Sequence, residues 1–179
     1  MKNNIFDNYK NNTLTPITCD YTTELQFKAA CKTAGAYELH RFFQLSPYRT
    51  LRDNLESNCL KPQLFLQISQ ELQLEEKLDK YPCELNSLDM ERAALAKAVL
   101  SGAELLVCFN TTEGLTPGET LSYYGDLHAI STKYSIKSVL LRTKIFPLAR
   151  PVSTLRTPSA AAVDIATCPP DAVKPSLAC

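Results

Sequence analysis

Two short apolar runs separated by a strong helix start constrain the fold of this chain more than any other feature. Residues 105–109 and 135–141 are rich in Leu, Ile and Val, which is typical of strands buried on both faces in a parallel sheet. Between them, Thr116, Pro117 and Glu119 have the spacing of a helix N-cap, first position and capping-box partner. The order strand, helix, strand predicts an α/β protein with parallel, adjacent strands.

The apolar periodicity upstream predicts mainly helices. Asn86, followed three residues later by Asp89, has the pattern of a helix cap. Pro82 interrupts the chain just before it, and turn residues also surround Pro47. The predicted elements before residue 105 are helices at about 22–33, 51–59, 62–74 and 88–101, with a weak strand at 37–43.

Composition divides the chain into three parts. Residues 1–20 are polar, and we expect a frayed N-terminus there. Residues 21–150 hold the apolar periodic segments and are expected to form one domain, with a helical subdomain at about 51–103. Residues 151–179 contain five prolines and few large apolar side chains, so we expect an irregular, Pro-rich tail.

Charge and cysteine usage exclude several classes of function. The chain has 19 Lys and Arg against 19 Asp and Glu, without the basic excess of a nucleic-acid-binding protein. It has only two histidines, and none of its seven cysteines are spaced as Cys-x-x-Cys, so we expect no metal site. No apolar run approaches the roughly 20 residues of a membrane span, and the Asn-rich start has no signal-peptide pattern. These features predict a cytoplasmic location.

A series of short segments between residues 42 and 150 has the order and spacing of a known family. Phe43-Gln44 ahead of Pro47 resembles the glutamine loop, and residues 81–89 with the helix that carries Arg92 resemble the signature region. The strand 105–109 with Thr112 to Pro117 resembles the Walker B strand, and Thr143 to Arg150 resembles the switch region. These are motifs of the ATP-binding-cassette (ABC) nucleotide-binding domain that powers transporters, which the chain resembles. The resemblance implies a partial P-loop-NTPase-like parallel sheet flanked by helices.

The departures from this family fall on the residues that carry its chemistry. The family holds ATP with a Gly-x-x-x-x-Gly-Lys-Ser/Thr loop, whereas the first of the five glycines here is Gly35. Phe109 stands at the position of the magnesium-supporting aspartate, and Asn110 at that of the catalytic glutamate. Ser87 and Leu88 replace the signature glycines. We therefore expect no catalytic residue and no bound cofactor.

Three polar residues remain as candidates. Gln44 keeps the residue of the family's glutamine loop and is the candidate nucleotide-contacting residue. Glu113 lies three residues after the position of the missing glutamate, which is a poor place for a substitute base. Lys144 occupies the switch-histidine position, where a lysine can hold an anion or simply be exposed in a loop.

The sequence thus favours a non-hydrolysing ABC-ATPase-like protein, a pseudoenzyme that acts as a binding or docking subunit. The resemblance implies an intact ABC ATPase subunit or a membrane permease as partner, contacted through residues 51–80, which would place the chain at the inner face of the membrane. One alternative is an ATP-binding subunit whose site is unconventional or completed by another chain. Another is a decayed protein without selected function.

Overall fold

The computed structural model describes residue 6 and residues 14–40, 44–57 and 59–143. The chain divides into two units, Met1–Phe146 and Pro147–Cys179, and all described residues belong to the first. The predicted Pro-rich tail at 151–179 and the candidate Lys144 lie outside the described residues.

Four parallel strands form the described sheet, in the order β1-β4-β3-β2. The central pair is the one expected from the two apolar runs, and its register places Phe109 opposite Leu141. The predicted parallel, adjacent placement of these strands is therefore confirmed. The strands are β1 (Leu14–Cys19), β2 (Tyr37–His40), β3 (Leu105–Phe109) and β4 (Lys137–Thr143).

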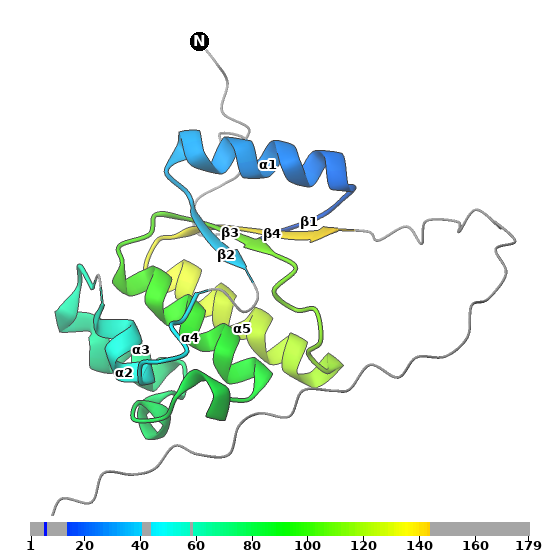
Figure 1. Cartoon of the computed structure of the whole chain (residues 1–179). Helices are drawn as coiled ribbons and strands as arrows, with labels where there is room; N and C mark the ends of the chain where they lie inside the picture. The colour runs from blue at the N-terminus through cyan, green and yellow to red at the C-terminus, as the bar shows by residue number, and fades with distance from the viewer. Residues whose placement is uncertain (1–5, 7–13, 41–43, 58, 144–179) are drawn as a thin grey trace, which may run out of the picture. The chain divides into compact units, whose positions relative to one another are not determined.

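Helices cover both faces of this sheet, with α1 on one face and α4 and α5 on the other (Figure 1). Each of the longer helices begins at a side chain that accepts a hydrogen bond from a first-turn amide, namely Asp20, Asn86 and Thr116. No helix within the described ranges is both long and apolar enough to cross a bilayer. The helices are α1 (Tyr21–Ala34), α2 (Leu51–Glu56), α3 (Phe65–Glu71), α4 (Ser87–Leu100) and α5 (Pro117–Lys133), with 3-10 turns at Pro62–Leu64, Glu75–Lys77 and Pro82–Glu84.

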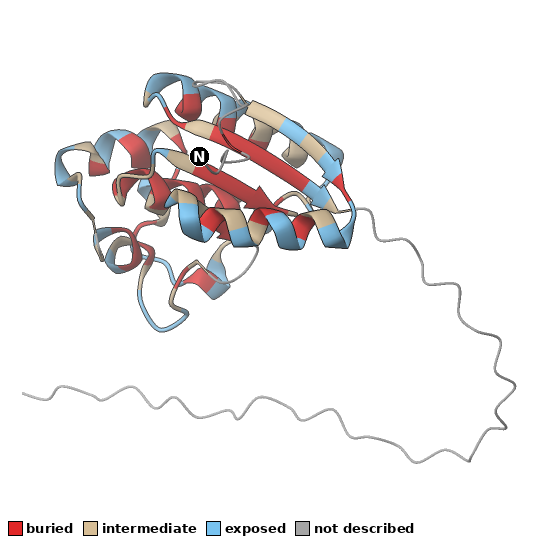
Figure 2. Ribbon diagram, turned by 90° about the horizontal axis from the view of Figure 1, so that it is seen from above, coloured by how far each residue is buried: buried red, intermediate tan, exposed pale blue. Residues whose placement is uncertain are grey.

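The central strands supply the core on both faces, and they are buried along most of their length (Figure 2). Leu106 and Leu140 pack with the helices α2 to α5, whereas Val107 and Leu141 pack against α1. This alternation follows from the two-residue period of a strand. The α1 side is completed by Phe6, whose ring lies 5.8 Å from that of Phe27.

The expectation of a frayed N-terminus is wrong for residues 14–19, because these residues form β1. The strand pairs with β4 in parallel, from Leu14 opposite Ser138 to Cys19 opposite Thr143. It lies at the edge of the sheet, where Pro16 is tolerated because only one side of the strand needs ladder hydrogen bonds. The folded unit therefore starts before residue 21, which we had expected as its boundary.

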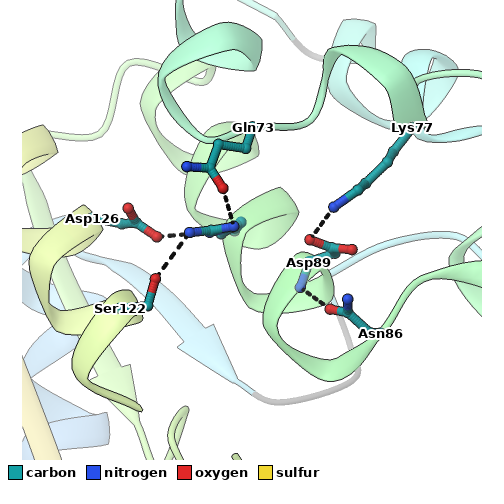
Figure 3. A network of polar contacts seen from close by, with 7 residues as sticks. Gln73, Lys77, Asn86, Asp89, Ser122 and Asp126 are labelled. Carbon is teal, nitrogen blue, oxygen red and sulfur yellow. Dashed lines mark hydrogen bonds and ion pairs between the residues drawn. The ribbon is translucent and has the colours of Figure 1, made fainter. Parts of the chain in front are cut away.

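A buried arginine joins α4 to its neighbours, and its partners Gln73, Ser122 and Asp126 are labelled in Figure 3. Arg92 is 6% exposed, and its Nε donates to Asp126 at 2.7 Å on α5. Its two remaining nitrogens donate to Gln73 at 2.9 Å and to Ser122 at 3.0 Å. At the start of the same helix, Asp89 pairs with Lys77 at 2.5 Å. The guanidinium thus has partners on two other segments, α5 and the turn after α3, as a buried charge requires.

The burial of β3 leads to a stability prediction. Leu106→Ala should lower the free energy of unfolding by about 2–5 kcal/mol, because Leu106 is fully buried between the sheet and the helices. Leu66→Ala is a matched control, because that leucine is 66% exposed on α3 and should cost far less. Urea denaturation of both variants measures the difference. A near-neutral Leu106→Ala would contradict the position of β3 in the core.

Candidate functional site

The carboxyl ends of the four strands meet at one edge of the sheet, because all the strands are parallel. The strands end at Cys19, His40, Phe109 and Thr143. Open α/β sheets bind their ligands outside this edge. The candidate site is therefore the sheet edge and the first turns of α1, and we call it the carboxyl edge.

The passage from β1 to α1 takes a single residue, Asp20. Its Oδ1 accepts a hydrogen bond from the backbone N–H of Thr23 at 2.7 Å. This hydrogen bond to the backbone amide lowers the pKa of the Asp20 carboxyl below its usual value. A helix N-terminus that follows a strand is a ready anion site, and here the chain's own carboxylate uses one of its amides.

Glu24, one turn further along α1, connects this helix to the end of β4. It is 7% exposed, and it accepts a hydrogen bond from the Thr143 hydroxyl and pairs with Lys28 at 2.6 Å. Burial acts to raise the pKa of Glu24, but the hydrogen bonds from Lys28 and Thr143 outweigh it and the pKa is lowered. The carboxylate therefore stays charged and joins α1 to β4.

Asn110 continues this chain of hydrogen bonds at the end of β3. Its Oδ1 accepts from the backbone N–H of Thr143 at 2.9 Å, and its Nδ2 donates to the Thr143 hydroxyl at 3.2 Å. The backbone of Asn110 has a positive φ of 53°, a conformation that asparagine tolerates better than most residues. Both polar atoms of its side chain are thus engaged in joining β3 to β4.

An aromatic stack occupies the end of β3 beside these contacts. The ring of His40 lies parallel to that of Phe109, with 4.7 Å between centroids. The ammonium of Lys28 lies 5.3 Å from the centroid of the same Phe109 ring. His40 also contacts the Glu38 carboxylate at 2.9 Å. Side chains from α1 and β2 therefore pack around Phe109, which is 3% exposed.

Gln44 lies just beyond β2, apart from the contacts at Asn110. Its Nε2 donates to the Glu38 carbonyl at 2.7 Å, and its own backbone carbonyl accepts from Lys97 at 2.9 Å. It borders a hollow of only about 20 Å³, together with His40, Ser87 and Glu91. Gln44 as a nucleotide contact stays a prediction.

Sequence reasoning missed Asp20, because residues 1–20 were expected to be frayed. It placed Glu24 and Lys28 in the predicted helix at 22–33 but gave them no role. A usable signal was present, since an aspartate before an apolar periodic stretch and a glutamate in the first turn are typical of a helix N-terminus. Glu113 borders a hollow of about 270 Å³ with Asn110 and Thr143. Among the described residues, no three His, Cys, Asp or Glu side chains are grouped to hold a metal ion.

The comparison with solved structures decides the fold class. The crystal structure of the ADP conformation of MJ1267, an ATP-binding cassette of an ABC transporter, superposes with a TM-score of 0.61 at 12% identity, over 77% of this chain and 73% of that one. The fold is that of an ATP-binding cassette. A second structure of MJ1267 matches with a TM-score of 0.55 at 15% identity, over 66% of this chain and 55% of that one.

Sequence comparison agrees with the structural match. The chain is 25% identical over 111 residues to the methionine import ATP-binding protein MetN of Desulfitobacterium hafniense, covering 58% of this chain and 33% of that protein. It is 32% identical over 68 residues to MetN of Photobacterium profundum, covering 38% of this chain and 20% of that protein. These matches support homology to the ATP-binding domain of ABC transporters. The chain spans a third or less of the length of these relatives, and no protein-family model matches it.

The contacts of Glu24 give a pH-dependent prediction. Its pKa is lower in the folded protein than in the unfolded chain, so its stabilisation is present above about pH 4.3 and is lost as the pH falls through the folded pKa. Glu24→Gln should lower the free energy of unfolding by about 1–3 kcal/mol at pH 7. The difference from the unmodified protein should shrink as the pH falls below about 4.

Thermal denaturation between neutral and acidic pH measures this effect. Glu56→Gln is the matched control, because Glu56 is exposed and its side chain has no hydrogen bond or ion pair within the described part of the chain. Equal stabilities of Glu24→Gln and the unmodified protein at pH 7 would contradict the structural role of Glu24.

Proposed function

We propose that the chain is a non-hydrolysing ABC-ATPase-like protein that acts as a binding or docking subunit. The observation that carries this proposal is the direct passage from β1 to α1 through Asp20. In a phosphate-binding loop, several glycine-rich residues would separate strand and helix, and backbone amides would face the phosphates. Here the first turn of the helix is capped by a carboxylate, which repels phosphate.

The end of β3 supports the same proposal. A magnesium ion bound with a nucleotide needs a carboxylate or another oxygen ligand there, and water activation needs a base. Phe109 offers neither, and the amide of Asn110 has no basic group and is bonded to Thr143. Glu24, a buried carboxylate joined to this strand end through Thr143, is paired with Lys28. The side chains of the carboxyl edge are therefore better suited to holding the strands and α1 together than to catalysing ATP hydrolysis.

The partners follow from the relatives. An ATP-binding protein that serves import works with other subunits, so we propose an intact ATPase subunit or a membrane permease as partner. Residues 51–80 are the proposed contact, and they expose Leu60 and Leu66 at 74% and 66%. Such a partner would keep the chain in the cytoplasm, at the inner face of the membrane.

An ATP-binding subunit is the second candidate, and the similarity to the two MetN proteins favours it. In that case the missing phosphate loop must be replaced by an unconventional site or by groups from another chain. Gln44 would then be the nucleotide-contacting residue. The two candidates differ in one property, which is whether the purified chain binds ATP by itself.

Thermal shift with MgATP separates the candidates. We expect no change in Tm and no ATP hydrolysis above background, whereas a ligand at one hundred times its Kd would stabilise the protein by about 2.7 kcal/mol. An intact ABC ATPase domain in the same assay is the positive control. A saturable rise in Tm that Gln44→Ala abolishes would contradict the first candidate and support the second.

Restoring the missing carboxylates should not restore activity. The double change Phe109→Asp with Asn110→Glu supplies the family's residues at the end of β3, but it leaves the β1–α1 connection unchanged. It should destabilise the protein by at least about 3 kcal/mol, because it removes a buried aromatic ring and places two carboxylates together. Steady-state ATPase assays and urea denaturation measure the two effects, and measurable turnover would count against the proposal.

A further inference from the structure

Two hollows lie side by side between the end of β4 and the first half of α5. One has a volume of about 270 Å³ and the other of about 550 Å³. They share Thr112, Glu113 and Arg142, so they form one continuous depression. We call it the β4–α5 groove. Its larger part lies within the range of about 300–1,000 Å³ that small-molecule sites occupy.

Two opposite charges border this groove without contacting each other. Leu141 packs against α1, and successive side chains of a strand alternate, so Arg142 lies on the α5 side. Neither the Arg142 guanidinium nor the Glu113 carboxylate makes a hydrogen bond or an ion pair within the described ranges. Both side chains border both hollows, so each is left with an unused charge at the groove.

An apolar wall lies along the α5 side of the groove. Leu115, Pro117, Leu121 and Tyr124 line the larger hollow. Leu121 is 74% exposed, which makes it one of the most exposed large apolar side chains of the described residues. A ligand that covers this wall removes apolar surface from water, at roughly 25 cal/mol for each Å².

We propose that the β4–α5 groove binds a free α-amino acid with an apolar side chain. The carboxylate of the ligand pairs with Arg142, its ammonium pairs with Glu113, and its side chain packs on Leu121 and Tyr124. This proposal goes beyond the docking function and does not depend on it.

The pair of charges is what selects this class of ligand. A purely anionic compound would pair with Arg142 but would share the groove with the Glu113 carboxylate, and like charges repel. A purely cationic compound would pair with Glu113 but would share the groove with the Arg142 guanidinium, which repels it. An α-amino acid carries both charges on one carbon and satisfies both side chains at once, while its apolar side chain meets the wall of α5.

A matched ligand series tests the proposal on the full chain. L-leucine carries both charges, 4-methylpentanoate lacks the ammonium, and 3-methylbutylamine lacks the carboxylate. In ¹⁵N–¹H correlation spectra, leucine should produce saturable shifts at residues 112–115 and 121–124. The two analogues should bind at least about tenfold more weakly, because each leaves one charge of the groove unpaired.

Charge-neutralising variants identify the residues. Arg142→Gln and Glu113→Gln should each weaken leucine binding at least about tenfold, whereas the exposed controls Lys32→Gln and Glu56→Gln should leave it unchanged. All four changes are at exposed side chains, so Tm should be preserved. No saturation up to about 10 mM leucine, tenfold above a Kd of 1 mM, would overturn the proposal. Equal binding of 4-methylpentanoate and leucine would overturn it as well.

Discussion

The pairing of β3 with β4 is the interaction on which the rest of this structure depends. Both strands are buried along most of their length, and they alternate Leu106 and Leu140 on one face with Val107 and Leu141 on the other. A parallel sheet of this kind must be covered on both faces, because neither face can be left in water. The positions of α1 on one side and of α4 and α5 on the other follow from that requirement.

Much of this arrangement could be predicted from local sequence. The capping box at Thr116 and Glu119 and the Asn86 cap both form as expected, because caps depend on residues three positions apart. β1 could not be predicted in the same way. Its residues 14–19 have no apolar run, and the strand exists only because it pairs with β4, more than 120 residues later.

In the candidate site too, features set by neighbouring residues could be predicted, whereas contacts between distant residues could not. Phe109 and Asn110 could be placed at the end of a strand from the apolar run before them. The hydrogen bond from Thr143 to Glu24 joins residues 119 positions apart, and no periodicity indicates such a contact. The passage from β1 to α1 through one residue likewise depends on β1, a strand that forms by pairing with the distant β4.

The contacts of Arg92 also determine how this protein can move. The guanidinium donates hydrogen bonds to Asp126 and Ser122 on α5 and to Gln73 after α3. It therefore links three segments, which are α4 itself, α5 and the turn after α3. A shift of α4 alone would leave a buried positive charge without its partners, which costs several kcal/mol. We therefore expect a force applied at the turn after α3 to move α4 and α5 together.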